Sequence, residues 1–226
     1  MIKLTNKLKK KAANVAIELI KEELNPNLVI GIGTGSTTDF FIDKLKKFSK
    51  FFKGAVASSY RSAIKLKKCG IELIDLKDVK SIPIYIDGAD EINNELFMIK
   101  GKGGALTYEK VLSSVSDLFI CIVEESKLVN KLGTLCPLPI EILPISITTT
   151  TKFLRNLGGE VFLRKKFITE SGNLILDVFG LSFKNVKELE ICINNIPGVV
   201  SCGIFSLRSA DIAIISRRDR INFINF

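Results

Sequence analysis

Histidine is absent from all 226 residues of this sequence. Imidazole is the side chain that most often moves protons near neutral pH, so proton transfer here must use Asp, Glu, Lys, Cys or Tyr. The same absence excludes a Ser-His-Asp triad and a histidine-containing metal site. If the chain is an enzyme that moves protons, a carboxylate is the natural base.

Long apolar runs are missing as well. No stretch of about 18 apolar residues occurs, so we expect no membrane-spanning segment and no membrane partner. The first apolar stretch is interrupted by charges at Glu18, Lys21, Glu22 and Glu23, which does not fit a secretory signal peptide.

Paired cysteines are the third absence, because none of the five cysteines forms a CxxC motif. An odd number of scattered cysteines is typical of reduced, buried thiols in a cytosolic protein. We therefore expect a cytoplasmic location, no disulfide framework and no metal site. The cysteines are Cys69, Cys121, Cys136, Cys192 and Cys202.

Acidic residues are fewer than basic ones, 24 against 33, which gives a formal net charge of +9. A positive charge of this kind favours binding to nucleic acid, to an anionic membrane surface or to an anionic small molecule. The densest basic runs, residues 7–11 and 44–53, read as polar faces of amphipathic helices and lack interleaved aromatic stacking residues. We expect no nucleic-acid partner; a steep salt dependence of RNA binding would support the opposite interpretation.

Strand and helix patterns alternate through the first half of the chain, which predicts a parallel, Rossmann-like sheet. Apolar residues at helical spacing predict a helix over 7–24. Short apolar runs predict strands separated by helices, and the run at 118–123 is typical of a strand buried on both faces. These strands are predicted at 28–30, 55–57, 71–74, 82–86 and 118–123.

The pattern changes after Pro137 and predicts a βαββαβ order, a ferredoxin-like unit. Its elements are strand 145–148, helix 151–157, strands 160–163 and 174–179, helix 185–194 and strand 199–205, and the run 212–215 is predicted to return to the first sheet. The expected fold class is α/β, with a Rossmann-like catalytic domain (residues 1–131 plus 206–226) and a smaller ferredoxin-like α+β domain (132–205).

A glycine-rich turn, GIGTGST at residues 31–37, lies between a predicted strand and a predicted helix. Glycines let the backbone approach an anion, and amides at a helix N-terminus attract phosphate. The turn lacks the GK[ST] of a Walker A motif, and Ser36 stands where a dinucleotide fingerprint needs glycine. By itself the turn has a purely structural interpretation as well.

Three carboxylates follow the predicted strand 82–86 in the motif DGADE, residues 87–91. Carboxyl ends of strands are where open α/β sheets bind ligands. A solvated acidic turn is the simpler interpretation, and the spacing of a calcium-binding EF-hand is missing.

A second glycine-rich loop, KGKGG at residues 100–104, precedes a helix that begins near Thr107. Glu109 in its first turn has a simple role available, which is to offset the helix dipole. For Lys102 and Lys110 we expect solvent-facing side chains. Lys127 follows strand 118–123 and is a candidate anion contact.

These motifs, in this order, resemble ribose-5-phosphate isomerase type A. The resemblance rests on GTGST (33–37), DGADE (87–91), KGKGGAL (100–106), the Glu-Lys pair (109–110), SK (126–127), PLPIEILP (137–144), GNLILD (172–177) and IPGVV (196–200). It covers nearly the whole chain, and the pair DGADE and KGxGGAL at this spacing is its most specific part. One departure is Lys102, in a loop that is often all glycine.

The resemblance implies a cofactor-free aldose–ketose isomerase that interconverts ribose 5-phosphate and ribulose 5-phosphate in the non-oxidative pentose phosphate pathway. It also implies an oligomer, usually a homodimer. Glu109 corresponds to the proton acceptor, with Asp87, Asp90 and Lys100 as further catalytic residues. The substrate-binding positions are Thr34, Gly35, Ser36, Thr37, Asp87, Gly88, Ala89, Asp90, Lys100, Gly101, Lys102, Gly103 and Lys127, and Lys10 is a weaker match.

Three alternatives remain at this stage. A sugar-phosphate-binding sensor module without catalysis would need a DNA-binding helix-turn-helix. The first predicted strand begins at residue 28, which leaves room for only one helix before it. An amino-sugar-phosphate deaminase would use a histidine, which this chain lacks. A phosphogluconolactonase on a related fold is the third.

Overall fold

The structure is a computed structural model that describes residues 2–225, and their contacts divide them into two compact units. The first unit holds the described residues up to Gly88, Val111–Lys127 and the residues from Ala210 onward; the second holds Ala89–Lys110 and Leu128–Ser209. Residues 89–110 therefore group with the second unit, whereas the predicted boundaries placed them with the first. Because units defined by contacts need not coincide with folding domains, those boundaries remain a prediction.

A six-stranded sheet in the order β13-β12-β6-β3-β1-β2 forms the centre of the first unit. All neighbours are parallel except β13, which pairs antiparallel with β12. The predicted parallel sheet and the return of residues 212–215 to it are confirmed. The strands are β1 (Val29–Ile32), β2 (Gly54–Ala57), β3 (Ile82–Asp87), β6 (Ser116–Glu124), β12 (Ile212–Ser216) and β13 (Ile221–Asn225).

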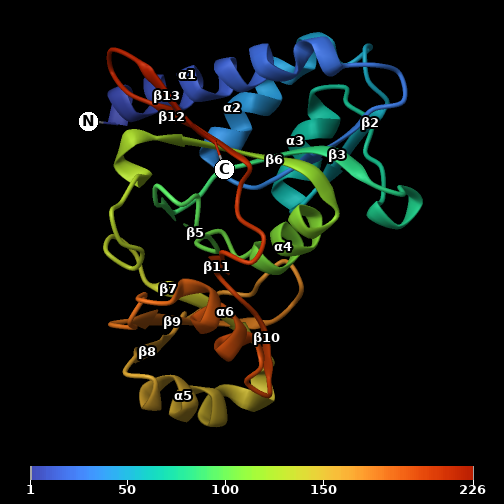
Figure 1. Cartoon of the computed structure of the whole chain (residues 1–226). Helices are drawn as coiled ribbons and strands as arrows, with labels where there is room; N and C mark the ends of the chain where they lie inside the picture. Colours follow the sequence, from blue (N-terminus) through green and yellow to red (C-terminus); the bar gives the residue numbers. More distant parts are fainter. Residues whose placement is uncertain (1, 226) are drawn as a thin grey trace. The chain divides into compact units, whose positions relative to one another are not determined.

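Three helices supply apolar side chains to the core of this unit: α1 (Ile2–Ile20), α2 (Ser36–Leu45) and α3 (Tyr60–Lys68). Helices α1 and α2 lie side by side in Figure 1. Small residues of α1, such as Ala12 and Ala16, are fully buried in this core. Within residues 2–225, no helix is both long and apolar enough to cross a membrane.

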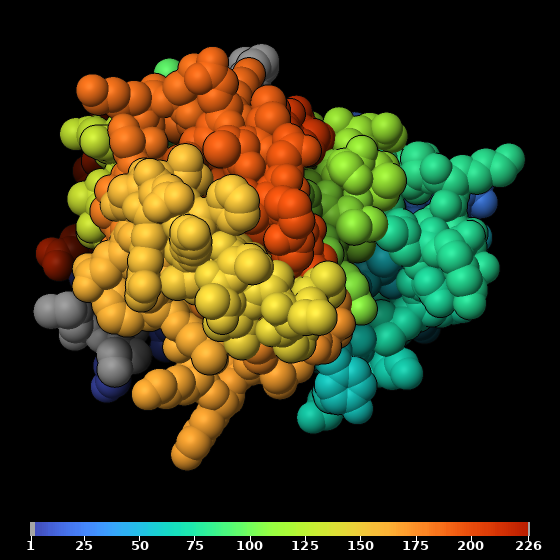
Figure 2. All heavy atoms as spheres, turned by 90° about the horizontal axis from the view of Figure 1, so that it is seen from below, coloured from blue at the N-terminus to red at the C-terminus, as the bar shows by residue number. Residues whose placement is uncertain are grey.

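The second unit contains an antiparallel sheet in the order β10-β7-β9-β8. Along the chain its elements run βαββαβ, which confirms the predicted ferredoxin-like order. Both helices contribute side chains to the apolar core of the unit. The yellow atoms of α5 lie at the surface in Figure 2. The elements are β7 (Leu138–Ile142), α5 (Ile147–Asn156), β8 (Glu160–Leu163), β9 (Leu174–Phe179), α6 (Val186–Asn194) and β10 (Val199–Cys202).

A three-stranded sheet in the order β11-β5-β4 completes the second unit. Its strands are β4 (Glu91–Ile92), β5 (Met98–Ile99) and β11 (Ile204–Phe205), and helix α4 (Leu106–Ser114) follows the loop after β5. Short 3-10 turns are η1 (Lys21–Glu23), η2 (Lys46–Phe48), η3 (Leu76–Asp78), η4 (Glu125–Lys127) and η5 (Pro144–Ser146).

Several predicted elements are wrong in detail. The predicted strand 71–74 makes a single bridge, between Leu73 and Ala55, and the predicted strand 145–148 lies in η5 and the start of α5. Periodicity cannot separate a short β-branched run from a buried helix start, which explains the second error. The predicted strand 199–205 is divided between β10 and β11, which belong to different sheets.

All five cysteines are free thiols, as expected, but their burial varies. Cys121 and Cys202 are buried, and burial raises the pKa of the Cys202 thiol to about 11. Cys192 is exposed on α6, so the expectation of buried thiols is wrong for it.

Candidate active site

In the first unit, the candidate site lies where the strand order of the sheet reverses. From β1 the chain continues to β2 on one side and then to β3 on the other. Open α/β sheets bind ligands at such a reversal, outside the carboxyl ends of the strands. GTGST follows β1, and Asp87 is the last residue of β3.

Asp87 is fully buried and accepts three hydrogen bonds. Its Oδ1 accepts from the amides of Thr34 (3.0 Å) and Gly88 (2.7 Å), and its Oδ2 accepts from the hydroxyl of Tyr85 (2.6 Å). Donors on both oxygens hold this carboxylate in one orientation. The structure thus joins the glycine-rich turn and DGADE through one carboxylate.

Two glycines in the turn are required by geometry. A Cβ at Gly33 would lie 1.8 Å from Cγ of Asp87, so any side chain there would displace that carboxylate. Gly35 has φ of 138°, a conformation that favours glycine, and it caps helix α2 without a side-chain hydrogen bond. Ser36 and Thr37 therefore begin a helix whose N-terminus can bind an anion.

Hydroxyl groups and one lysine surround this turn. Thr34 Oγ1 lies 2.8 Å from Oγ of Ser58, which is buried directly after β2. Lys9 Nζ donates to Oγ of Ser36 at 2.8 Å. Neither Ser58 nor Lys9 was predicted, because neither lies in a motif; in this part of the chain only Lys10 was named, as a weaker match. Lys10 instead places its ammonium 5.2 Å from the centre of the Phe40 ring.

Lys127 is half-buried in η4, three residues after the end of β6. Because β6 is parallel to β3, Lys127 follows the carboxyl end of a strand that neighbours the strand of Asp87. Of the predicted residues, the structure thus gathers Thr34, Asp87 and Gly88, with the start of α2, at one edge of this sheet.

In the second unit, Lys100 and Glu109 form a buried ion pair. Lys100 Nζ lies 3.3 Å from Oε2 of Glu109, and their side chains are 3% and 5% exposed. Lys100 follows β5, and its amide donates to the carbonyl of Gly203 at 2.9 Å. Glu109 belongs to the first turn of α4, where the helix dipole also favours a negative charge. The dipole therefore does not account for Glu109 by itself.

The loop between these two residues is held by polar contacts to its backbone. Asp90 Oδ2 accepts from the amide of Lys102 at 2.9 Å, while the Lys102 side chain is exposed, as expected. Arg164 donates from NH1 to the carbonyls of Gly101 and Lys102, and it is paired with Asp177. Arg164 was not predicted, since it lies about 60 residues from the loop that it holds.

Glu141 anchors the start of helix α4 although it was not predicted. It is fully buried on β7 and accepts from Oγ1 of Thr107 at 2.6 Å. Three side chains of the β8–β9 connection also donate to this carboxylate, namely Thr169, Ser171 and Asn173. Since Thr107 lies two residues before Glu109, these contacts help to fix the turn that carries Glu109.

Glu91, the last residue of DGADE, has a structural role. Its buried carboxylate accepts hydrogen bonds from four consecutive backbone amides, those of residues 133–136. Its negative charge is thereby satisfied without a ligand.

Lys110 corrects another expectation, because its side chain does not face the solvent. It is 23% exposed, and Nζ donates to Oε1 of Glu190 at 2.5 Å and to the carbonyl of Ile204. The neighbouring residues Glu109 and Lys110 therefore have different partners: Glu109 is paired with Lys100, and Lys110 is paired with Glu190.

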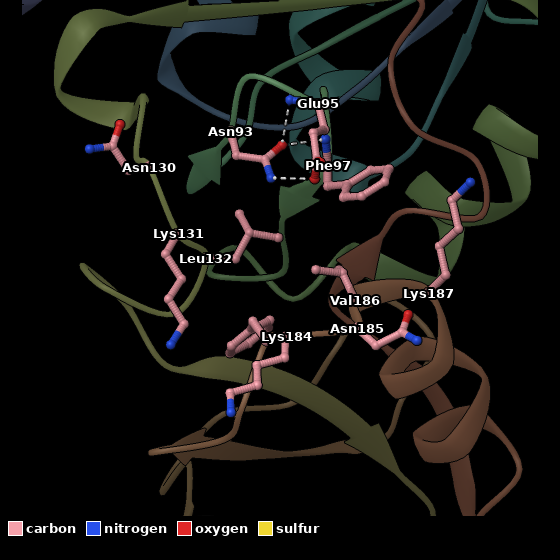
Figure 3. A pocket seen from close by; sticks show the side chains of 11 residues that line it. Asn93, Glu95, Phe97, Asn130, Lys131, Leu132, Lys184, Asn185, Val186 and Lys187 are labelled. Atoms are coloured by element: carbon pink, nitrogen blue, oxygen red, sulfur yellow. Dashed lines mark hydrogen bonds between the residues drawn. The ribbon is translucent and has the colours of Figure 1, made fainter.

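A separate pocket of about 310 Å³ lies in the second unit beside the start of α6 (Figure 3). Lys131, Lys184 and Lys187 line it, together with Glu95 and apolar side chains. None of the predicted site residues lines this pocket. The buried pair of Lys100 and Glu109 does not line it.

An α/β fold with a glycine-rich turn at a helix N-terminus and a buried carboxylate–ammonium pair is typical of enzymes that act on small anionic substrates. A profile of the family "Ribose 5-phosphate isomerase A (phosphoriboisomerase A)" matches residues 54–220. Ribose-5-phosphate isomerase A from Bordetella avium is 51% identical over 214 residues, 95% of each chain. The protein of that name from Buchnera aphidicola (subsp. Acyrthosiphon pisum) is 48% identical over 97% of this chain and 96% of its own.

Solved structures agree with these matches. Ribose 5-phosphate isomerase A from Neisseria gonorrhoeae superposes with a TM-score of 0.93 at 41% identity, covering 98% of this chain and 97% of its own. A D-ribose-5-phosphate isomerase in complex with phospho-erythronic acid superposes with a TM-score of 0.91 at 34% identity. The match covers 98% of this chain and 99% of that structure's chain. The chain belongs to the ribose 5-phosphate isomerase A family.

The close contact at Gly33 generates a prediction about stability. We expect Gly33→Ala to lower the free energy of unfolding by about 1–3 kcal/mol, because its Cβ would displace the buried carboxylate of Asp87. Thermal melting measures the effect. Gly88→Ala is the matched control, since its Cβ meets nothing nearer than 3.6 Å. Equal melting temperatures for the two variants would contradict the geometry.

Proposed function

We propose that this protein interconverts D-ribose 5-phosphate and D-ribulose 5-phosphate. The observation that carries the proposal is the buried pair of Glu109 and Lys100, a carboxylate and an ammonium 3.3 Å apart at the start of a helix. Aldose–ketose exchange needs one group that moves a proton between C1 and C2 and another that stabilises the charge on the sugar oxygen. Membership of the family supports the same reaction.

The proposed mechanism assigns the proton transfer to Glu109. Its carboxylate removes the C2 proton of the open-chain aldose, which gives a cis-enediolate, and returns that proton to C1. The hydroxyl proton of O2 passes to O1 in the same conversion, so that the aldehyde at C1 becomes an alcohol and C2 becomes the ketone. Lys100 stabilises the developing enediolate oxygen by charge. Asp87 assists ring opening, and Asp90, whose carboxylate holds the amide of Lys102, orients a hydroxyl group or Lys100.

The phosphate end of the substrate is assigned to residues 34–37 and Lys127. Backbone amides and hydroxyl groups at the start of α2 suit an anion, and Lys9 supplies a positive charge beside Ser36. Gly88, Ala89 and residues 101–103 are assigned to the sugar. The relative that was solved with phospho-erythronic acid supports a sugar-phosphate ligand.

The reaction as proposed needs no metal and no organic cofactor, because acid–base groups of the chain suffice for it. A place in the pentose phosphate pathway and a cytoplasmic location follow from the substrate and from the reduced cysteines. A sensor that binds the sugar phosphate without catalysis is the alternative, and turnover by the purified protein separates the two.

We expect Glu109→Gln to lower kcat by about 10²–10⁴, the usual contribution of a positioned base. The measurement is formation of ribulose 5-phosphate by EDTA-treated protein, with folding checked by thermal melting. Glu23→Gln is the matched control, since Glu23 is exposed in η1. Turnover of Glu109→Gln at the level of this control would refute the assignment.

Ser36→Ala is expected to raise KM more than it lowers kcat, because phosphate contacts form in both the ground state and the transition state. Initial rates over a range of ribose 5-phosphate concentrations measure the two constants. A fall in kcat with unchanged KM would count against a phosphate-binding role for this turn.

A homodimer is the proposed assembly. Large apolar side chains are exposed on the second unit, including Phe153, Phe162 and Phe179, and exposed apolar surface of this kind favours association. Light scattering after gel filtration is expected to give twice the chain mass of 25.0 kDa. A monomer mass across micromolar concentrations would contradict the dimer.

A further inference from the structure

Two ion pairs of the second unit meet at one aromatic ring. The ammonium of Lys110 lies 4.3 Å from the centre of the Phe205 ring, and that of Lys100 lies 5.6 Å from the same centre. Phe205 is 1% exposed, so this contact is shielded from water. An aromatic ring attracts a cation, but two cations at one ring repel each other, strongly so where water is scarce.

Each ammonium group has its own carboxylate. Lys100 is paired with Glu109 at 3.3 Å, and Lys110 is paired with Glu190 at 2.5 Å. Because Glu109 and Lys110 are adjacent on helix α4, the carboxylate proposed as the base is also the nearest one along the chain to Lys110. Consecutive residues of a helix point in different directions, and Lys110 approaches the ring of Phe205. Its positive charge nevertheless lies at the same ring as that of Lys100, so it must be balanced close to the Lys100–Glu109 pair.

Glu190 is fixed in place by the segment that carries Phe205. Its Oε2 accepts from the amide and the hydroxyl of Ser206, both at 2.8 Å, and from the amide of Leu207 at 2.9 Å. Its side chain is 3% exposed. Three donors on one oxygen and an ammonium on the other hold this carboxylate in one position.

We propose that Glu190 is a positioning residue for the isomerase reaction: it holds Lys110 and balances its charge, so that Lys110 does not disturb the pair of Lys100 and Glu109. This inference rests on the proposed function, in which Glu109 moves the proton and Lys100 stabilises the enediolate. Glu190 acts only through Lys110 and need not contact the substrate.

The test uses Glu190→Gln in the full-length protein. A glutamine keeps the size but loses the charge. Because its amide nitrogen donates and only its oxygen accepts, it cannot accept from both Lys110 and the 206–207 segment through separate atoms as the carboxylate does. We expect kcat to fall about tenfold, within the range of coupling energies in one network, while KM changes by less than about twofold. Glu188→Gln, an exposed position on the same helix, is the matched control with wild-type constants.

Rescue separates positioning from a general loss of stability. Lys110→Met removes the ammonium itself, so Glu190→Gln combined with Lys110→Met is expected to regain the kcat of Lys110→Met alone. A double variant no faster than Glu190→Gln, or Glu190→Gln with wild-type kcat, would overturn the inference.

Two further results are decisive. If thermal melting shows that Glu190→Gln is unfolded, Glu190→Asp takes its place, because it keeps the charge but withdraws it by one methylene group. A several-fold lower kcat then supports the inference, and a wild-type kcat overturns it.

A wild-type protein that does not turn over ribose 5-phosphate would overturn the proposed function and this inference together. An active wild type with an unaffected Glu190→Gln overturns this inference alone.

Discussion

The buried contact between Lys100 and Glu109 is the interaction on which the second unit depends. Removing two charges from water costs several kcal/mol per ion, as an order of magnitude, unless the pair is held in good geometry. The neighbouring residues supply that geometry. The carbonyl of Gly203 holds the backbone of Lys100, Glu141 holds the first turn of α4, and Glu190 binds Lys110. Retaining so costly a pair is understandable where both charges serve the reaction.

The first unit follows a different principle, because its charge is held by backbone amides. Asp87 binds the turn after β1, and Gly33 leaves the space for it. The same turn opens α2, whose N-terminus suits an anion. A single buried carboxylate thus organises the loop assigned to phosphate. The chain has no histidine, and the buried ionisable groups of both candidate regions include acidic side chains instead.

The sequence predicted the strands and motifs whose signal is local. GTGST, DGADE and KGKGG each combine glycine with polar residues within a few positions. The strands before GTGST and DGADE were recognised by short apolar runs, whereas the two-residue strand β5 before KGKGG was not predicted. The prediction for residues 145–148 failed because a short β-branched run has no clear period. Strand β13 was missed because its alternation is weak and both its faces remain partly exposed.

Residues that support the site from a distance could not be predicted in this way. Arg164, Glu141 and Glu190 lie in separate segments, without glycine turns or clustered charges, and their roles depend on which strands become neighbours. Lys110 was assigned to solvent because a lysine on a helix usually faces water. Only the position of Glu190, 80 residues away, reverses that expectation.

The central claim, that a carboxylate moves a proton through an enediolate, is tested most directly by the fate of the substrate hydrogen. EDTA-treated wild-type protein would convert ribose 5-phosphate in D2O, with NMR used to locate deuterium in the product. The account predicts deuterium at C1 of ribulose 5-phosphate, because a proton held on Glu109 can exchange with solvent. Complete conversion without any deuterium in the product would contradict it and indicate direct hydride transfer between C2 and C1.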